Sequence, residues 1–394
     1  MMARNNDLGV AKTAKKDEFY TQLTDIEKEM RYYRKHFKGK IVLCNCDDPF
    51  ESNFFKYFVL NFNRLGLKKL IATCYYTSPI SGEQLQYQFD PDGQMTLSFG
   101  TNITKENTNK HPYKAVVTQV YDKSGDGSID MIDIAKLFES GENRLTELKG
   151  DGDFRSDECL SLLDEADIVV TNPPFSLFRD YVSVLMEHQK NFIIIGNVNA
   201  ITYKEFFPLI KENKVWFGAS IHSGDRKFYV PDDYPLNASG CGIDEEGHRY
   251  IRVKGVRWYT NLDLKQRHEE LILVKRYTPE RYPKYENYNA INVNETADIP
   301  CDYDGIMGVP ITFMDKYCPE QFEILGLSIG TLFDGNALGE DFMKLYRAQG
   351  GTGHYSKNMI GLGLIDIDGK AKVPYGRILI RNKHPEAPYG GKKQ

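Results

Sequence analysis

The sequence predicts an α/β fold with a mainly parallel sheet, helices on both faces, a β-rich insertion and a smaller C-terminal α+β region. Three observations support this prediction. Short apolar runs rich in β-branched residues, such as residues 40–46, alternate with segments of helical periodicity, such as residues 52–65. The order strand, turn, helix, strand begins a βαβ unit. This alternation is interrupted at residues 81–120 and stops beyond residue 276.

The individual elements follow from these local patterns. After a polar leader at residues 1–16, we expect helices over residues 25–35, 52–65, 133–140, 157–165, 177–188 and 203–213. We expect strands over residues 40–46, 67–76, 167–171, 191–196, 214–217, 227–230, 249–259 and 271–275. A stretch rich in Tyr, Pro and Asn at residues 277–294 is the best candidate boundary. It separates a larger domain over residues 1–276 from a smaller region over residues 277–394.

Length, charge and cysteine usage narrow the class of protein. The chain has 394 residues, and 50 Lys and Arg against 55 Asp and Glu give a net charge of −5. This balance excludes a strongly basic nucleic-acid coat protein, although it allows a local basic cleft. No apolar run reaches the roughly 18–20 residues of a membrane span. The N-terminus lacks a signal-peptide core, and the seven cysteines form no spaced framework. We therefore expect a cytoplasmic protein with reduced thiols and no membrane partner.

The strongest motif is Asn172-Pro173-Pro174-Phe175, directly after the strand expected at residues 167–171. Both prolines lack an N–H and cannot continue a buried strand, so they hold the chain in a rigid turn. This turn lies at the carboxyl end of the strand, where open α/β sheets bind ligands. An ordinary strand-terminating turn is the alternative interpretation.

The residue types of this motif suit one particular chemistry. The Asn172 side-chain carbonyl and the Pro173 main-chain carbonyl can accept the two hydrogens of an exocyclic amine, which aims its lone pair at an electrophile. The Phe175 ring offers a stacking face for a planar base, worth roughly 1–3 kcal/mol. A base inside a duplex is unreachable and must first be flipped out. Catalysis of this kind depends mostly on positioning.

The motif resembles that of the S-adenosylmethionine-dependent N6-adenine DNA methyltransferases, and the wider sequence resembles the EcoRI-type adenine-specific methyltransferase family. The stretches that carry the resemblance are CNCDDPFESNFFKYF, GDGDFRSDE, ADIVVTNPPFSLFRDYV, GVRWYTNLD and MGVPITFMDKYCPEQFEI. The resemblance implies a Rossmann-like methyltransferase sheet, S-adenosyl-L-methionine as cofactor, and methyl transfer to adenine N6 in double-stranded DNA. It also implies that residues 1–276 are catalytic and that residues 277–394 recognise the target.

The resemblance places the cofactor at the end of the first strand, at Asn45, Asp47, Asp48 and Pro49. The acidic residue followed by Gly-x-Gly that is usual in the family is missing there. Two carboxylates suit a partly cationic ligand with an amino-acid tail. Alternatively, they cap the helix that follows, because its dipole favours negative charge.

Two further motifs resemble cofactor-binding segments of the family. Asp153 would accept a hydrogen bond from the exocyclic amine of the cofactor, and Phe154 would pack on its adenine ring; a polar turn is the alternative. Tyr20 and Thr21 belong to a stretch that resembles the N-terminal cofactor motif. A segment that leads into a helix is the alternative there.

Other signals are weaker. Residues 122–133 match a calcium-loop template apart from Asp at the twelfth position, but a solvated turn explains them better, so no metal is predicted. Residues 257–261 form an aromatic cluster, which is either close to the flipped base, as the resemblance implies, or core. Candidates for reading base edges are Arg347, Gln349, residues 350–353, His354, Lys357, Asn358, Arg377, Arg381 and Lys383. A solvated face is the alternative for each.

Two other functions stay open at the level of sequence. One is methylation of RNA or of a protein glutamine, because glutamine methyltransferases share Asn-Pro-Pro-Tyr. The other is a catalytically silent DNA-binding relative, because the cofactor motif after the first strand lacks the Gly-x-Gly that is usual in the family. The expected partner is double-stranded DNA, with a cognate restriction endonuclease that acts separately, and a monomer is the expected form. Restriction–modification, an orphan epigenetic mark and phage self-protection are not distinguished.

Overall fold

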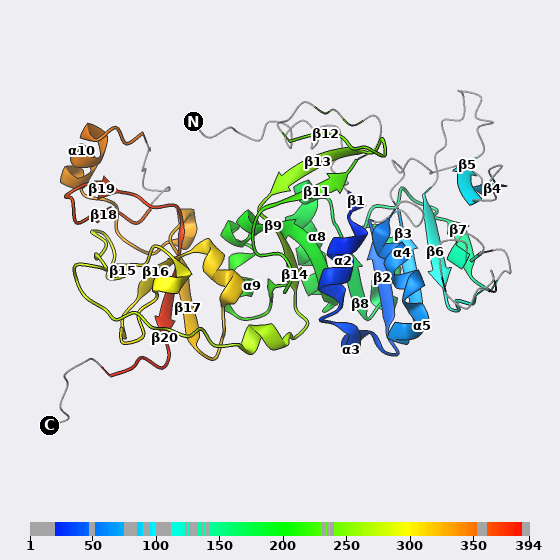
Figure 1. Ribbon diagram of the computed structural model, residues 1–394, viewed down its shortest axis with the longest axis horizontal. Helices are drawn as coiled ribbons and strands as arrows, with labels where there is room; N and C mark the ends of the chain where they lie inside the picture. Colours follow the sequence, from blue (N-terminus) through cyan, green and yellow to red (C-terminus); the bar gives the residue numbers. More distant parts are fainter. Residues whose placement is uncertain are drawn as a thin grey trace. The chain divides into compact units, whose positions relative to one another are not determined.

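The computed structural model describes most of the chain, as two compact units. The described residues are 20–46, 52–74, 85–89, 95–99, 112–122, 125, 129, 133–134, 137–138, 142–230, 234, 236, 240–352 and 361–387. Unit 1 comprises residues 1–197 and 223–262, and unit 2 comprises residues 198–222 and 263–394 (Figure 1). None of the helices described in either unit is long and apolar enough to cross a membrane. The functional division predicted at residues 276/277 stays a prediction.

Unit 1 begins with short elements that lead into its central strands. These are β1 (Tyr20–Thr21), α2 (Leu23–Met30), α3 (Arg34–Phe37), β2 (Ile41–Asn45), α4 (Asn53–Leu60), α5 (Phe62–Leu65) and β3 (Lys69–Thr73). The helix predicted over 52–65 is divided at Asn61, which departs from helical geometry with φ −108° and ψ 7°. Gly66 then ends α5 with φ 63°, a left-handed conformation that glycine adopts without steric cost. The helix predicted over 25–35 is likewise two helices.

The main sheet of unit 1 is mixed, with a parallel centre. Its strands in this unit run in the order β14-β9-β8-β2-β3-β6-β7. The pairs β2–β3, β2–β8 and β8–β9 are parallel, whereas β6 and β14 run antiparallel to their neighbours. The bounds of the added strands are β6 (Tyr113–Val117), β7 (Arg144–Glu147), β8 (Ile168–Thr171), β9 (Asn191–Asn197) and β14 (Val256–Thr260).

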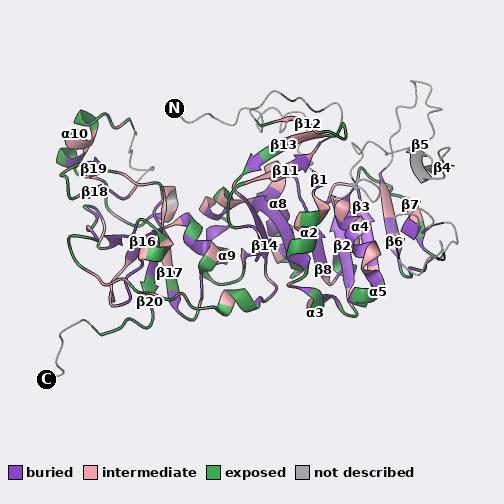
Figure 2. Cartoon of the chain, viewed as in Figure 1, coloured by how far each residue is buried: buried purple, intermediate pink, exposed green. Residues whose placement is uncertain are grey.

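The central strands are buried along their whole length. Every residue of β2 and of β8 is buried, as expected for parallel strands covered on both faces (Figure 2). The helix α7 (Asp157–Glu165) contacts β2, and α8 (Phe178–Glu187) contacts β9. Between β8 and α8 lies the single turn η1 (Phe175–Leu177). The mixed α/β class predicted from the sequence is therefore confirmed.

A second, antiparallel sheet completes unit 1, in the order β1-β11-β13-β12. Its further strands are β11 (Asp225–Tyr229), β12 (Gly242–Ile243) and β13 (Arg249–Lys254). The single strand predicted over 249–259 is wrong, because Gly255 breaks it with φ 71°; β13 then belongs to the second sheet and β14 to the main sheet. Within the region predicted as a β-rich insertion, β4 (Leu85–Phe89) pairs with β5 (Met95–Phe99) as a hairpin.

Unit 2 contains a small sheet in the order β15-β16-β20-β17 and a separate two-stranded hairpin, β18-β19. Its strands are β10 (Trp216–Phe217), β15 (Ile291–Asn292), β16 (Met307–Pro310), β17 (Phe322–Leu327), β18 (Leu364–Ile365), β19 (Ala371–Lys372) and β20 (Arg377–Asn382). Its helices are η2 (Val198–Thr202), α9 (Phe207–Lys211), η3 (Lys265–His268), η4 (Thr296–Asp298), η5 (Ile311–Lys316), η6 (Gly330–Leu332) and α10 (Glu340–Ala348). The helix predicted over 203–213 is thus reduced to α9.

The strand predicted over residues 271–275 is absent from the described structure. Both main-chain groups of Leu271 bond to the side chain of Gln321 instead of to a strand, at 2.8 Å each. Only an isolated bridge joins Lys275 to Pro300. The apolar side chains of this segment are exposed, because Ile272 is 91% and Val274 is 71% accessible.

Candidate active site

The site lies at the carboxyl ends of β2 and β8. After β2 the chain continues into β3 on one side of β2, and it later returns to form β8 on the other side. Such a reversal is the point where open α/β sheets bind ligands. The pairing of Leu43 with Val169 brings Asn45 and Thr171 to the same edge, and the Thr171 hydroxyl donates a hydrogen bond to the main-chain oxygen of Asn45.

The four predicted catalytic residues follow at this edge in one turn. Asn172 is 5% exposed, and its Oδ1 atom is buried. Pro173 and Pro174 are also buried, and the Pro174 carbonyl accepts a hydrogen bond from Leu177 N at 2.9 Å, which closes η1. Phe175 is half-buried and meets Phe228 of β11 edge-on, with ring centroids 6.3 Å apart. The structure thus brings the predicted motif to the expected strand end, although the catalytic roles stay predictions.

Asn45 and Phe154, both predicted cofactor residues, are joined through a third side chain. The hydroxyl of Tyr181, on α8, donates a hydrogen bond to Asn45 Oδ1. The Tyr181 ring meets the Phe154 ring edge-on, with centroids 5.0 Å apart. The sequence analysis missed Tyr181, because its only signal was a place on the apolar face of an amphipathic helix.

Asp153 is held by its neighbour Arg155. The guanidinium donates from Nε to Asp153 Oδ1 at 2.9 Å and from Nη2 to Oδ2 at 2.7 Å. It also lies 5.1 Å from the centroid of the Phe154 ring. Bidentate contacts of this kind are strong. An adenine amine bound to Asp153 would therefore share this carboxylate with Arg155.

Tyr20 and Thr21 form β1, which pairs with β11 and places Thr21 opposite Phe228. The main-chain oxygen of Thr21 accepts a hydrogen bond from Asn53 Nδ2, at the start of α4, at 2.7 Å. Because Phe228 also meets Phe175, β1 lies one strand away from the catalytic turn. The structure brings both residues to the site region, and their contact with the cofactor stays a prediction.

The second sheet also carries a strong ion pair next to Phe228. Lys227 Nζ lies 2.7 Å from Asp244 Oδ2 and 4.7 Å from the ring centroid of Tyr229. The hydrogen bond from Lys227 lowers the pKa of Asp244 to about 2, and the same bond raises the pKa of Lys227. Both groups therefore stay charged at neutral pH.

Some predicted residues lie outside the described part of the chain, namely Asp47, Asp48, Pro49, Gly353, His354, Lys357 and Asn358. The last described residue before the gap, Cys46, has φ 74°. This left-handed conformation favours glycine, so the turn after β2 is made here without a glycine. Most of the calcium-loop candidate at 122–133 is also not described. The residues that are described contain no group of three or more His, Cys, Asp or Glu side chains that could hold a metal.

Several weaker candidates are engaged in structural contacts. Trp258 is 1% exposed and meets Phe54 with centroids 5.9 Å apart, which is core packing. Tyr259 donates a hydrogen bond to the main-chain oxygen of Asn197 at 2.8 Å. Among the candidates for base recognition, four bond within unit 2: Gln349 to Ala371 N, Arg377 to Asn292, Arg381 to Glu323 and Lys383 to the Pro319 carbonyl.

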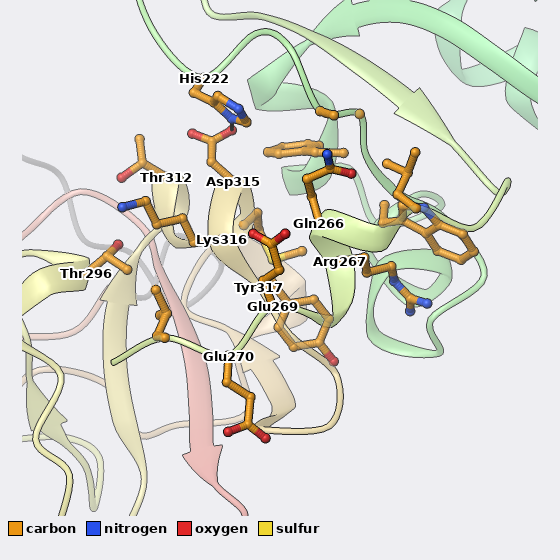
Figure 3. A pocket seen from close by; sticks show the side chains of 17 residues that line it. His222, Gln266, Arg267, Glu269, Glu270, Thr296, Thr312, Asp315, Lys316 and Tyr317 are labelled. Carbon is orange, nitrogen blue, oxygen red and sulfur yellow. Dashed lines mark ion pairs between the residues drawn. The ribbon is translucent and has the colours of Figure 1, made fainter. Parts of the chain in front are cut away.

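A cavity of about 540 Å³ lies wholly within unit 2. Figure 3 shows His222 and Asp315 facing each other in its wall, and Nδ1 of the histidine lies 3.8 Å from Oδ1 of the aspartate. Arg267 lies over the ring of Trp216 at 3.8 Å. None of the predicted catalytic or cofactor residues lines this cavity. The candidate active site therefore remains the strand-end position in unit 1.

Comparison with known proteins defines the class. The family model described as adenine-specific methyltransferase EcoRI matches residues 7–383. The type II methyltransferase M.EcoRI of Escherichia coli is 44% identical over 383 residues, which are 97% of this chain and 98% of that protein. M.MpnI of Mycoplasma pneumoniae is 35% identical over 80% of this chain and 83% of its own, and M.MgeORF184P of Mycoplasma genitalium is 34% identical over 80% and 84%. No solved structure matches.

These matches define a DNA methyltransferase. The chain belongs to the EcoRI family of these enzymes, because the family model spans nearly all of it. The resemblance inferred from the sequence motifs is confirmed.

Proposed function

We propose that the protein transfers a methyl group from S-adenosyl-L-methionine to the N6 amine of an adenine flipped out of double-stranded DNA. As a member of the EcoRI family it is a DNA methyltransferase. The observation that carries the site assignment is the position of Asn172-Pro173-Pro174-Phe175, directly after β8 and beside the end of β2. A nucleobase amine and a methyl donor have to meet at such a point for the transfer to occur.

The residues at the strand ends suit these two ligands. Asn172 Oδ1 and the Pro173 carbonyl accept the two amine hydrogens, and the Phe175 ring stacks on the base. When bound, S-adenosylmethionine supplies an electrophilic methyl group on its sulfonium. The buried amide of Asn45 and the apolar ring of Phe154 provide a polar and a flat contact for that cofactor. With S-adenosylmethionine bound, the N6 nitrogen would form a bond to its methyl carbon while the bond from that carbon to the sulfonium sulfur breaks. The sulfur would keep that electron pair and leave as the neutral thioether S-adenosylhomocysteine, and N6 would release one proton to solvent.

The finer features of the enzyme belong to the same proposal. The mixed sheet of unit 1 is a Rossmann-like methyltransferase sheet with helices on both faces, and residues 1–276 carry catalysis. Residues 277–394 recognise the DNA target. Tyr20, Thr21, Asn45, Asp47, Asp48, Pro49, Asp153 and Phe154 hold the cofactor. The protein acts in the cytoplasm as a monomer, with any cognate restriction endonuclease acting separately.

A transfer experiment tests the substrate. Purified protein is incubated with methyl-labelled S-adenosylmethionine and, separately, unmethylated duplex DNA, RNA and a protein extract. We expect label in DNA alone, recovered as N6-methyladenine after digestion. Label confined to RNA or protein would reject the DNA substrate. Calorimetry that finds no cofactor binding, with or without DNA, would support a catalytically silent relative.

A further inference from the structure

The two faces of the second sheet in unit 1 differ in what they contact. Its strands β11 and β13 lie side by side (Figure 1). Because side chains alternate along a strand, Arg226 and Phe228 of β11 lie on one face, whereas Lys227 and its partner Arg252 of β13 lie on the other. Phe228 is 1% exposed and meets the ring of Phe175 in the catalytic turn. Arg226 therefore belongs to the face that contacts this turn.

The guanidinium of Arg226 has a donor without an acceptor. Its Nη1 atom donates to the main-chain oxygen of Asp225 at 3.1 Å. Its Nε atom is buried, and no acceptor in the described part of the chain bonds to it. The carboxylate of Asp25 lies 4.0 Å away, measured from Nε to Oδ2, which is too far for a hydrogen bond. The side chain as a whole is 26% exposed, so it is accessible from solvent.

A second unbonded donor lies beside the same aspartate. Nε2 of Gln22, the residue after β1, is also buried without an acceptor among the residues that the structure describes. The main-chain oxygen of Gln22 accepts a hydrogen bond from Asp25 N at 3.0 Å, so Gln22 and Arg226 both adjoin Asp25. Buried donors are nearly always bonded in proteins, and two exceptions beside one residue call for an explanation.

The charges around Asp25 favour an anionic ligand. Lys28 Nζ lies 4.0 Å from Asp25 Oδ1, and Arg226 approaches Oδ2. Two cations thus flank one carboxylate, and one positive charge remains in excess. A guanidinium binds the oxygens of a phosphate through parallel donors, which is why Arg is common at phosphate sites. An anion with oxygen acceptors would therefore satisfy the unbonded donors.

We propose that Arg226, assisted by Gln22, binds a backbone phosphate of the DNA strand that carries the target adenine. The inference rests on the proposed function, in which the adenine stacks on Phe175. The Cα atoms of Arg226 and Phe228 are about 7 Å apart, the length of two residues in a strand. A flipped nucleotide stays attached to the phosphates on either side of it, so a phosphate has to lie close to a base held at Phe175. The contact carries no sequence information and fixes the position of the strand while the adenine is out of the duplex.

Arg252 provides a matched control on the opposite face of the same sheet. Its Nη1 atom lies 3.7 Å from Asp225 Oδ1, and 48% of its side chain is exposed. Arg252 is therefore a more accessible cation than Arg226, but it lies on the face away from the catalytic turn. If charge and exposure alone decided DNA binding, replacement of Arg252 would have the larger effect.

The first test measures binding of the full chain to a duplex that the unmodified protein methylates, by fluorescence anisotropy at several salt concentrations. Arg226→Gln should weaken binding about 10-fold, as expected when a hydrogen bond between charged groups is lost. It should also lower the slope of log affinity against log salt by about 0.9, the contribution of one phosphate contact. Arg226→Lys should restore that slope, because it keeps the charge. Arg252→Gln should change the affinity less than about 3-fold.

A second test changes the DNA instead of the protein. Single uncharged methylphosphonate linkages replace, one at a time, the phosphates beside the methylated adenine of that duplex. One of these linkages should weaken binding of the unmodified protein about 10-fold, because it removes the charge that Arg226 binds. The same linkage should affect Arg226→Gln less than about 3-fold, since that variant has already lost the contact. Calorimetry with S-adenosylmethionine in the absence of DNA should give the same affinity for Arg226→Gln as for the unmodified protein, which also verifies that the variant is folded.

Several results would overturn the proposal. An unchanged salt slope in Arg226→Gln, or an unmodified protein that tolerates every uncharged linkage, would show that Arg226 binds no phosphate. An effect of Arg252→Gln as large as that of Arg226→Gln would mean that the measurement reports overall charge. Loss of S-adenosylmethionine affinity in Arg226→Gln would assign the free donors to the cofactor instead of to DNA. Failure of the unmodified protein to bind or methylate any duplex DNA would refute the proposed function itself.

Discussion

Two buried asparagine side chains, Asn287 in unit 2 and Asn45 in unit 1, use their amides differently. In unit 2, Asn287 donates to the main-chain oxygens of Asn336 and Gly361 and accepts from Gly363 N, so its whole amide is bonded within the protein. In unit 1, the Asn45 amide bonds only through its oxygen among the described residues. The first amide ties loops together, whereas the second joins the end of β2 to Tyr181 of α8.

The largest effect on methyl transfer is expected when Asn172 is replaced. Asn287 is the matched control, because both side chains are 5% exposed. Asn172→Ala should lower methyl transfer about 10²-fold or more, since misplacing a reacting group has that cost. Cofactor affinity should stay near that of the unmodified protein. Asn287→Ala should lower the free energy of unfolding by about 2–4 kcal/mol because it leaves several groups unbonded, and it should preserve turnover of the folded enzyme. A comparable loss of turnover in both variants would remove the distinction between the two units.

Gly196 in unit 1 and Gly308 in unit 2 allow the same comparison for close packing. A Cβ on Gly196 would lie 2.4 Å from the Phe178 ring, and a Cβ on Gly308 would lie 2.5 Å from the Tyr285 hydroxyl. Each Gly→Ala change should lower the free energy of unfolding by about 1–3 kcal/mol, as overpacking usually does, and denaturant titration measures it. Only Gly196→Ala should also slow methyl transfer, because Phe178 begins the helix after the catalytic turn. Equal rates of methyl transfer by Gly196→Ala and Gly308→Ala would contradict this expectation.

Replacing the residues that cap α4 and α10 should change the stability of the protein by smaller amounts. Ser52 Oγ accepts hydrogen bonds from Phe54 N at 3.0 Å and Phe55 N at 3.5 Å, whereas Gly339 at the start of α10 provides no side-chain cap. Ser52→Ala should destabilise the protein by about 1 kcal/mol, and Gly339→Ser should stabilise it by about 0.3 kcal/mol. Thermal unfolding measures both changes. A gain from Ser52→Ala would show that the cap contributes nothing.

The smallest effect concerns pH. The carboxylates of Asp263 and Glu320, at 2.7 Å and 3.0 Å, raise the pKa of His268 above its ordinary value. The resulting stability is present in full below the unfolded pKa of about 6.5 and is lost as pH rises through the folded pKa. Because these side chains are largely exposed, the change should be small. His268→Gln should flatten the melting temperature between mildly acidic and mildly alkaline pH without altering cofactor affinity. If the melting temperature of His268→Gln still depends on pH as in the unmodified protein, this pH dependence does not come from His268.

The sequence predicted those features that depend on local patterns. The helix expected over residues 157–165 has those bounds in the structure, and the strand before the catalytic motif ends at Thr171. The position of Asn172-Pro173-Pro174-Phe175 followed from two prolines that cannot continue a strand. These predictions succeeded because neighbouring residues alone determine them.

Features that depend on tertiary contacts could not be predicted. Tyr181 looks like any apolar-face residue of an amphipathic helix, and only the folded chain brings its hydroxyl to Asn45. Gly255 divides one expected strand between two sheets, which no alternation of side chains reveals. The strand expected over residues 271–275 was wrong, because the main chain of Leu271 bonds to the side chain of Gln321 instead of to a neighbouring strand.

The backbone at Cys46 has a consequence for how relatives of this enzyme are identified. A search for the letters Gly-x-Gly after the first strand would reject this chain, although Cys46 makes a left-handed turn there with φ 74°. The chain makes this bend without the residue that ordinarily adopts such a conformation. A comparison of backbone angles would therefore detect divergent members that a pattern of letters overlooks.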